Sequence, residues 1–561
     1  MPFYRERGWL IGSGRVGGKG KGLAFAHHIL EKNGLLETVQ LPEYNFVITT
    51  SVFEEFMEQN NLWERLLNLR EHSDSPELYR ICSEAKLPAS LDEPLEKILD
   101  LIETPLSVRS SSILEDDVNL SFAGKYATRF TANSGTREQR RADLEAAIKT
   151  VYASTYNPAA REYKRKHGIK WGGERMAVVI QPIVGRKYSE LYYPELAGAA
   201  FSKVFRRPSP RIKKEDGVVR ICFGLGTRTV DRSFARTFYL TNPNLRPEGG
   251  KPDDIMAHSQ ENFDYIDLKN ECFSTEHISG VVKDIMLRHR MAQSYLQWYD
   301  DNSFHWIHSD VRNMFAPRPV FTFAELPSRC PKLFQRIRTL LPLFERELQL
   351  PVDMEFAYEA ADDIFTLVQL RPLSVYDDKG RVKIPHVEPE KIILRGDRMV
   401  ANGRLENIRH IVYVDPEIYG TKADFSDVAR AVGEINDSLD GERYILAGPG
   451  RWGSSNPTLG VPVRYSELSN SGCLVELGIP HKGMAPELSY GTHFFLDLDG
   501  DNILYLPVFD GAKNNVYNRE WFDSHEWTRT SHPAVRHYEG LFDVLLDGDT
   551  ETGVIIDRSE R

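Results

Sequence analysis

The sequence predicts a multidomain protein of mixed α/β (α+β) structure. The chain has 561 residues, which corresponds to roughly three or four domains. Hydrophobic residues make up 41% of it, enough for several cores. Strand-like runs such as "ERMAVVIQPIVG" alternate along the chain with amphipathic helical segments such as "DLEAAIKTVYASTY".

Charge, cysteine usage and hydropathy exclude several other classes. The formal net charge of −11 argues against a protein whose main role is to coat nucleic acid. The five cysteines are scattered without metal-binding spacing, which is typical of reduced thiols in the cytoplasm. No signal peptide and no run of 18 apolar residues is present, so we expect a cytoplasmic protein that does not enter a membrane.

Changes in composition divide the chain into four parts. Residues 1–240 and 241–375 are predicted to fold together, because strand and helix patterns continue through both. Residues 376–394 are polar and contain prolines, which is typical of an interdomain linker. Residues 395–561 are predicted to form a separate mixed α/β domain.

Glycines and lysines dominate the stretch "GRVGGKGKGLAFAHHIL", residues 14–30. Glycines allow backbone amides to converge on an anion, and a following helix adds a favourable dipole. We expect that helix to run from about Leu23 to Asn33, with Lys19 or Lys21 placing its charge on a phosphate. The alternative is a solvated turn before a helix, since the spacing does not fit a P-loop.

Arg109 ends an apolar strand in "SVRSSSILEDD" and precedes three serines. An arginine in this position can fork onto phosphate oxygens, and serine hydroxyls can donate further hydrogen bonds. The alternative is a surface ion pair between Arg109 and Glu115, Asp116 or Asp117.

The stretch "VDMEFAYEAADDIFTLVQLRP" predicts a hairpin that carries polar groups on one face. Asp353 and Glu355 alternate on the first strand, and Gln369 and Arg371 alternate on the second. Oxygen ligands of this kind suit Mg²⁺ bound to nucleotide phosphates, and the arginine can offset charge on a transferring phosphoryl group. The alternative is a structural ion pair between Glu355 and Arg371.

These elements occur in the same order in a known family. The chain resembles the nucleotide-binding part of phosphoenolpyruvate synthase and pyruvate phosphate dikinase, from about residue 10 to 375. The resemblance is carried by "VGGKGKGLA", "VRSS…SFAG", "AVVIQPIV", "AGAAFS", "GLG" and "DMEF…VQLRP".

The resemblance implies a two-lobed ATP-grasp-like fold that binds ATP and Mg²⁺ between its lobes. Lys19 and Arg109 would hold the phosphates, and Arg371 would stabilise the transferring group. Glu355 and Gln369 would bind Mg²⁺. The remaining implied positions are Gln181, Ile183 and Val184 beside the adenine, and Gly124 in a loop over the nucleotide.

The chain also departs from the family. No segment resembles its phosphohistidine signature or its pyruvate-binding barrel, so the full dikinase reaction is not expected. Thr227 in "GLGT" replaces an acid of the family's "GLGE". In the C-terminal region, the turn "GPGRWG" with Arg451 predicts an anion pocket. His493 is a candidate phosphoacceptor or general base, with a hydrogen-bonded core histidine as the alternative.

The resemblance and these residues together predict an ATP-dependent phosphotransferase. The acceptor would be a small molecule or a histidine, either His493 or one on a separate phospho-carrier protein. Two alternatives stay open: a non-catalytic ATP-binding sensor or scaffold, and an ATP-grasp ligase that joins a carboxylate to an amine.

Overall fold

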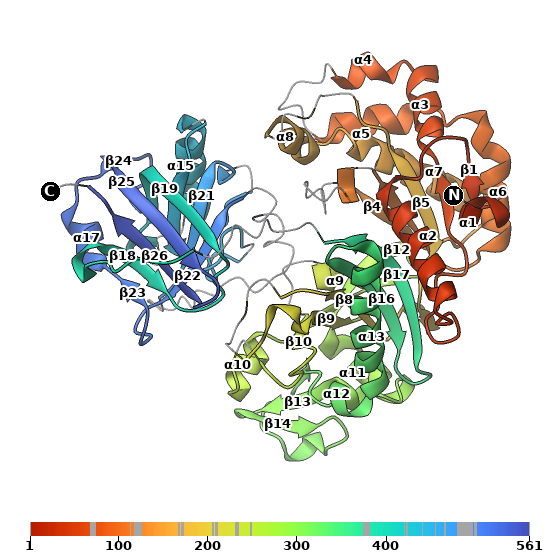
Figure 1. Ribbon diagram of the computed structural model, residues 1–561. Helices are drawn as coiled ribbons and strands as arrows, with labels where there is room; N and C mark the ends of the chain where they lie inside the picture. The colour runs from red at the N-terminus through yellow and green to blue at the C-terminus, as the bar shows by residue number, and fades with distance from the viewer. Residues whose placement is uncertain are drawn as a thin grey trace. The chain divides into compact units, whose positions relative to one another are not determined.

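The described residues form two compact units of mixed α and β structure, which confirms the predicted fold class (Figure 1). The first unit comprises Met1–Lys203 and Glu215–Ser374, and the second comprises Val204–Lys214 and Val375–Arg561. A computed structural model describes residues 2–559 except 68–74, 113, 117–125, 167–168, 170–172, 205–206, 208–210, 231–234, 247–248, 374–381, 420, 422–423, 440, 455, 465–466, 480–497 and 499–501.

Sheet A of the first unit has the strand order β1-β2-β5-β3-β4. Only β1 and β2 run parallel. Its strands are β1 (Leu10–Ile11), β2 (Phe46–Ile48), β3 (Leu106–Ser111), β4 (Thr128–Thr131) and β5 (Ala177–Pro182). Six helices contribute buried side chains to the core beside this sheet: α3 (Thr50–Gln59), α4 (Leu62–Leu67), α5 (Ser75–Glu84), α6 (Asp92–Leu101), α7 (Arg137–Ser154) and α8 (Pro158–Lys166).

Sheet B is antiparallel throughout, in the order β10-β9-β8-β16-β17. Its strands are β8 (Leu196–Phe201), β9 (Val218–Phe223), β10 (Arg236–Tyr239), β16 (Val352–Glu359) and β17 (Ile364–Pro372). The pairing of β16 with β17 confirms the predicted hairpin. The turn passes through Asp363 in the left-handed region, at φ 56°, a conformation that aspartate tolerates better than most residues.

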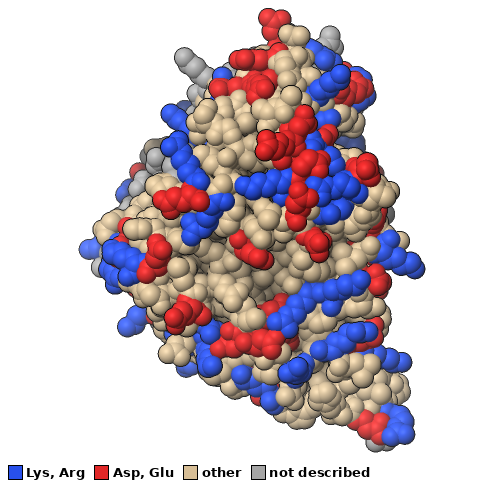
Figure 2. All heavy atoms as spheres, turned by 90° about the vertical axis from the view of Figure 1, so that its right-hand side faces the viewer, with Lys and Arg blue, Asp and Glu red and all other residues tan. Residues whose placement is uncertain are grey.

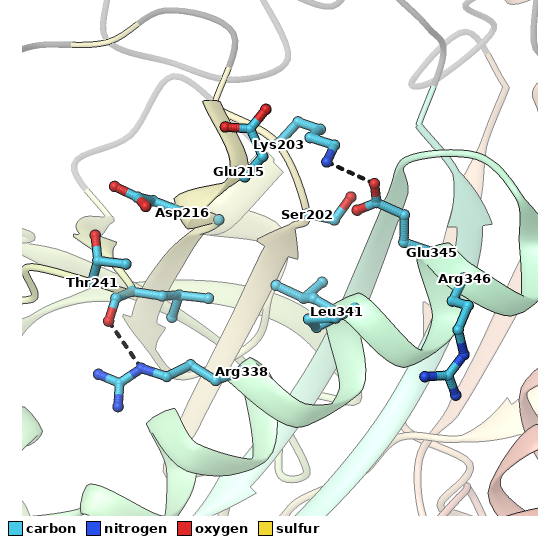
Figure 3. Close-up of a pocket in the computed structure, with 12 residues that line it drawn as sticks. Ser202, Lys203, Glu215, Asp216, Thr241, Arg338, Leu341, Glu345 and Arg346 are labelled. Atoms are coloured by element: carbon cyan, nitrogen blue, oxygen red, sulfur yellow. Dashed lines mark hydrogen bonds and ion pairs between the residues drawn. The ribbon is translucent and has the colours of Figure 1, made fainter. Parts of the chain in front are cut away.

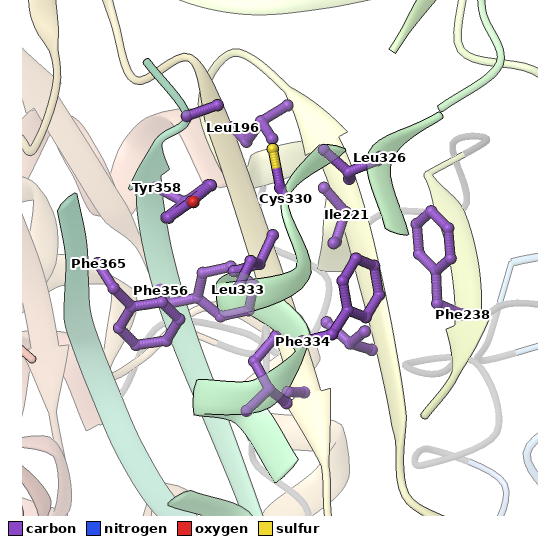
Figure 4. Close-up of a cluster of buried hydrophobic side chains, with 14 of the residues drawn as sticks. Leu196, Ile221, Phe238, Leu326, Cys330, Leu333, Phe334, Phe356, Tyr358 and Phe365 are labelled. Atoms are coloured by element: carbon purple, nitrogen blue, oxygen red, sulfur yellow. The ribbon is translucent and has the colours of Figure 1, made fainter. Parts of the chain in front are cut away.

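Helix α13 (Pro331–Leu348) packs on one face of sheet B, and the two share a large hydrophobic core (Figure 4). Phe356 stacks on Phe365 with ring centroids 4.8 Å apart. Met354 and Phe356 belong to this core, so the alternate residues Asp353 and Glu355 project from the opposite face. The polar side chains of the hairpin therefore lie on the face of sheet B that points away from α13.

The first unit also contains two smaller sheets and further helices. Sheet C has the order β12-β11-β7-β6 and sheet D the order β14-β13-β15. Their strands are β6 (Arg186–Tyr188), β7 (Leu191–Tyr193), β11 (Asn262–Asp267), β12 (Cys272–His277), β13 (Leu296–Asp300), β14 (Ser303–Trp306) and β15 (Arg318–Phe321). The helices are α1 (Pro2–Glu6), α2 (Gly17–Lys32), α9 (Thr227–Val230), α10 (Pro252–Ala257), α11 (Ile278–Arg288) and α12 (Leu326–Arg329).

Helix α2 begins at Gly17, six residues before the predicted start, so its glycines lie inside the helix. They allow close packing on two strands. A Cβ atom on Gly17 would lie 1.6 Å from the carbonyl oxygen of Ser111, and one on Gly22 would lie 1.9 Å from that of Leu370. This packing outweighs the cost of glycine in a helix, about 1 kcal/mol per residue. The open loop predicted from the glycines is therefore wrong.

We expect Gly22→Ala to destabilise the first unit by about 3 kcal/mol, because the added methyl group meets backbone rather than a movable side chain. Helix propensity alone predicts the opposite sign. Gly280→Ala in α11 is the matched control, since its Cβ would meet only the end of the Glu276 side chain. Urea denaturation followed by circular dichroism measures both. Equal stabilisation by the two substitutions would contradict this packing account.

A buried acidic pair lies where β8 and β16 meet sheet C. Glu195 accepts a hydrogen bond from the hydroxyl of Tyr295 at 2.9 Å and from the amide of Ala360 at 2.9 Å. Burial, together with the nearby Glu195 carboxylate, raises the pKa of Glu359 from 4.5 to about 7. Glu359 therefore keeps its proton in the folded protein at pH values where the unfolded chain has lost it.

This difference predicts that the stability of the first unit falls as pH rises from about 4.5 to 7. Glu359→Gln has no proton to lose at this position. We expect its free energy of unfolding, relative to the unsubstituted protein, to rise by about 2 kcal/mol between pH 5 and pH 8. Urea titrations at several pH values measure the change, with Glu345→Gln as control. A pH-independent difference would count against the raised pKa.

The second unit is built on one mixed sheet, in the order β22-β21-β20-β19-β25-β26-β18-β23, with β24 paired to β25. Strands β19 to β22 are parallel to one another, and the other pairs are antiparallel. The strands are β18 (Ile392–Gly396), β19 (Gly403–Val414), β20 (Tyr444–Pro449), β21 (Ser471–Gly478), β22 (Leu504–Phe509), β23 (Val516–Tyr517), β24 (Thr528–Arg529), β25 (Val535–Asp547) and β26 (Thr552–Asp557).

Helices and apolar side chains cover both faces of this sheet. Helix α15 (Phe425–Ser438) packs on the face that carries Val412, and Ile411 faces the opposite core. The shorter helices are α14 (Pro416–Tyr419) and α17 (Arg519–Ser524). Strand β18 begins at Ile392, inside the segment predicted to be a linker.

The distribution of charged side chains on the surface can be compared with that of proteins that bind nucleic acid. On the face shown in Figure 2, acidic and basic side chains are interspersed, without the continuous basic area that nucleic acid binding needs. Within the described part of the chain, no helix combines the length and apolar character needed to cross a membrane.

Candidate functional site

Arg109 joins sheet A to sheet B. Its Nη2 donates to Oε2 of Glu355 at 2.9 Å and to Oε1 of Gln369 at 2.7 Å. Glu355 and Gln369 are cross-strand partners on β16 and β17, and their side chains share a face. Three of the residues predicted from separate motifs therefore meet. Among the described residues, Arg109 pairs with Glu355 rather than with Glu115 or Asp116, and Asp117 lies outside them.

The next cross-strand pair on the hairpin is Asp353 and Arg371. Arg371 Nε donates to Oδ2 of Asp353 at 2.7 Å, and its Nη2 lies 2.5 Å from the same oxygen. Burial raises the pKa of Asp353, although Arg371 opposes the rise. The predicted alternative of a Glu355–Arg371 ion pair does not form, since each carboxylate has a different arginine.

Two polar atoms of this cluster are buried without a hydrogen-bond partner among the described residues. They are Oδ1 of Asp353 and Nε of Arg109. Unpaired buried polar atoms are rare in folded proteins, and each costs about 1–3 kcal/mol. One acceptor and one donor at this cluster are thus available to a ligand.

Strand β9 adds a further arginine to this face of sheet B. Arg220 is the cross-strand partner of Ala199, and Ala199 is the partner of Glu355. Cross-strand partners share a face, so Arg220, Ala199, Glu355 and Gln369 form one row. Arg220 is buried and donates to the carbonyl of Thr229 at 2.8 Å. Sequence reasoning missed it, although an arginine between apolar residues in "VVRICF" was a signal.

Lys19 belongs to a second, adjoining cluster. Its Nζ forms an ion pair with Glu115 and lies 3.3 Å from Oγ of Ser110, the residue that follows Arg109. The amides of Gly18 and Gly20 donate to the carbonyl of Ser112 at 3.0 Å and to Oγ of Ser111 at 3.1 Å. These two amides are therefore not available to bind phosphate. The ammonium group of Lys19 is the group of this stretch that we consider for phosphate binding.

An acid lies beside Thr227, where the sequence departs from its family pattern. The Thr227 hydroxyl donates to Oδ2 of Asp264 at 2.6 Å. Arg228 binds the same carboxylate with two nitrogen atoms, at 2.9 and 2.7 Å. Strand β11 thus supplies a carboxylate next to the threonine.

The segment predicted to border the adenine lies at the end of β5. The Gln181 side chain donates to Asn45 at 2.6 Å. The amide of Ile183 donates to the carbonyl of Pro105 at 2.7 Å, and its carbonyl accepts from the Tyr192 hydroxyl at 3.1 Å. Among the described residues, none forms a backbone hydrogen bond with Val184. Gly124 lies outside the described residues, so its role stays a prediction.

A separate pocket of about 460 Å³ opens beside α13 (Figure 3). Arg338 and Glu345 line it from α13, and Glu345 pairs with Lys203 at 2.7 Å. Because α13 covers the face of sheet B opposite Asp353 and Glu355, this pocket is distinct from the arginine–carboxylate cluster. None of the residues predicted from sequence lines it.

In the second unit, the turn after β20 does not form the predicted anion pocket. Its amides donate within the protein: Gly450 to Leu477, Arg451 to Leu459, and Trp452 to the carboxylate of Glu476 at 3.3 Å. Glu476 is fully buried, so the protein's own carboxylate takes the place expected for an external anion. His493 lies outside the described residues, and its role stays a prediction.

The donor set of the arginine–carboxylate cluster fits Mg²⁺. Glu355, Gln369 and Asp353 offer hard oxygen atoms, and Asp353 keeps one of them unpaired. Arg109 and Arg371 offer the planar donors that bind phosphate oxygens. This arrangement can hold a phosphate–metal pair by exchange of partners, in which each arginine leaves a carboxylate or amide for phosphate.

Residues 13–391 match the pyruvate phosphate dikinase AMP/ATP-binding domain. Because the match covers more than half of the chain, the protein belongs to this family.

One relative has also been named for its activity class. A stretch of 237 residues is 27% identical to "Uncharacterized phosphotransferase YvkC" of Bacillus subtilis (strain 168). The match covers 41% of this chain and 25% of that protein, so the shared part is about a quarter of the relative's length.

Proposed function

We propose that this protein transfers a phosphoryl group from Mg²⁺–ATP to an acceptor that is a small molecule or a histidine. The observation that carries the proposal is the contact of Arg109 with Glu355 and Gln369, next to the Asp353–Arg371 pair. The family's AMP/ATP-binding domain and the relative named as a phosphotransferase support it.

Charge balance explains how this cluster would bind its ligand. Without nucleotide, the two carboxylates neutralise two arginines. Phosphate without a cation would have to replace Glu355 and Asp353 as the partner of these guanidinium groups. The displaced carboxylates would then be left unpaired in a poorly solvated site, which costs free energy. If Glu355 and Asp353 held a divalent cation, the guanidinium groups of Arg109 and Arg371 would be free to bind phosphate oxygens. Nucleotide affinity should therefore depend strongly on Mg²⁺.

In such a site the protein acts mainly by positioning and by neutralising charge. Arg371 is proposed to stabilise the transferring phosphoryl group, and Arg109 and Lys19 to hold the other phosphates. Glu355 and Gln369 would hold the cation, with Asp353 as a further ligand. A magnesium ion held by these residues would supply positive charge that offsets the charge of the phosphates.

The acceptor would be His493, a histidine on a separate phospho-carrier protein, or a small molecule. The two lobes would close over the nucleotide as in an ATP-grasp fold. Gly124 would then lie above the nucleotide and Val184 beside the adenine. In each case the phosphorus–oxygen bond to the transferred phosphoryl group breaks, the acceptor atom loses a proton and bonds to that phosphorus, and the shortened nucleotide leaves as ADP or AMP.

Mass spectrometry after incubation with Mg²⁺–ATP tests this function directly. The purified chain is mixed with ATP, and both nucleotide products and intact protein mass are recorded. A gain of one phosphoryl group on the protein identifies a covalent intermediate, and loss of that gain in His493→Ala assigns it to His493. Nucleotide product formed only with an added metabolite identifies a small acceptor. ADP release that requires both a carboxylate and an amine would identify a ligase instead. Bound, unaltered ATP under every condition would identify a sensor and overturn the proposal.

A further inference from the structure

Three side chains with metal-binding atoms meet on the sheet of the second unit. In the β19–β25 pairing, His410 lies opposite Glu539 and Val412 lies opposite His537. Alternate residues of a strand share a face, so His410, His537 and Glu539 project from the same side of the sheet. One ligand atom from each lies within 4.8 Å of the other two.

The spacing of the two imidazoles is close to that of metal ligands. Nδ1 of His410 and Nε2 of His537 are 3.0 Å apart. A tetrahedral ion with bonds of about 2.0–2.1 Å holds its ligand atoms about 3.4 Å apart. The two imidazole nitrogens are therefore already close to the spacing that such an ion requires.

A fourth residue orients the first histidine. Oε2 of Glu442, which follows α15, lies 3.1 Å from Nε2 of His410. A carboxylate at this nitrogen keeps the proton there and directs the Nδ1 lone pair toward His537 and Glu539. Metal-ligating histidines usually have such a partner on the ring nitrogen that does not bind the metal.

The types of side chain in this cluster indicate which ion it would bind. Two imidazoles with one carboxylate suit Zn²⁺ and its neighbours in the first transition row better than Mg²⁺ or Ca²⁺.

We propose that His410, His537 and Glu539 bind one divalent transition-metal ion, with Zn²⁺ as the best-matched ion, and that Glu442 positions His410. Three protein ligands leave a fourth coordination position for water or another ligand. This site belongs to the second unit, and it does not depend on the function proposed for the first.

Zinc titration of the full chain tests the proposal. The protein is stripped with a chelator, transferred to buffer free of metal and nucleotide, and titrated with Zn²⁺ against a chromophoric chelator. We expect one Zn²⁺ per chain with a Kd of about 1 μM or lower. His410→Ala and His537→Ala should each weaken binding about 100-fold, and Glu442→Gln about 10-fold. His386→Ala, at a mostly exposed histidine, should leave it unchanged.

A second measurement guards against variants that fail to fold. Zn²⁺ should raise the melting temperature of the unsubstituted protein and of Glu355→Gln, but not of His410→Ala or His537→Asn. The proposal is overturned if the unsubstituted protein binds Zn²⁺ only above about 100 μM. It is equally overturned if a folded His410→Ala/His537→Ala variant binds as tightly as the original.

Discussion

Arg109→Ala is expected to lower the rate of ATP-dependent phosphoryl transfer by about 10³-fold, the lower end of the range for an arginine that stabilises phosphate charge. The substitution removes the guanidinium group that reaches from β3 to Glu355 and Gln369. It also leaves Glu355 without that counter-charge at a partly buried site. Steady-state kinetics with Mg²⁺–ATP and the acceptor identified by mass spectrometry measure the loss.

Two further variants test whether the loss of activity is specific to the guanidinium group of Arg109. Arg109→Lys keeps the charge but not the forked geometry, so it should recover only a small part of the rate. Arg338→Ala is the matched control, because Arg338 lies in the pocket beside α13 and donates to the carbonyl of Leu240 at 2.9 Å. If Arg338→Ala lost activity and Arg109→Ala retained it, the nucleotide would have to bind in that pocket.

Glu355→Gln is expected to separate the binding of metal from the binding of phosphate. Loss of the carboxylate should lower Mg²⁺-dependent turnover by about 10²-fold or more. The same change frees Arg109 from its ion pair, so ATP should bind more tightly than to the unsubstituted protein when Mg²⁺ is absent. Isothermal titration with ATP, with and without Mg²⁺, measures both effects.

The control for this variant is Glu345→Gln on α13, where an equivalent acid pairs with Lys203 on the other face of sheet B. It should leave the Mg²⁺ dependence of ATP binding unchanged. Equal responses of Glu355→Gln and Glu345→Gln would show that Glu355 has no special relation to the metal.

The sequence predicted the hairpin well because its information is local. Alternation alone assigns Asp353 and Glu355 to one face, and an acidic turn follows directly. The cross-strand pairs that bring in Gln369 and Arg371 then depend only on the length of the turn. Alternation also indicated that Asp353 belongs with the site, although the resemblance pointed to Glu355 and Gln369 alone as metal ligands.

Long-range packing limited the other predictions. From the sequence alone, the glycines before Leu23 resemble a flexible loop. The structure shows that Gly22 has a different role, because the absence of a Cβ atom lets helix α2 pack closely on β17. The anion expected beside Arg451 is a carboxylate, Glu476, whose strand pairs with β20. His410 and His537 are 127 residues apart, and their meeting depends on the register of β19 and β25.

The structure of the protein with a non-hydrolysable ATP analogue and Mg²⁺ tests the central claim most directly. The claim is that Arg109 exchanges Glu355 and Gln369 for phosphate when these two residues take the metal. The predicted result is a triphosphate on the Glu355 face of sheet B, with Arg109 and Arg371 on its oxygens and Mg²⁺ on Glu355 and Gln369. A nucleotide bound elsewhere, with Arg109 still paired to Glu355, would contradict it.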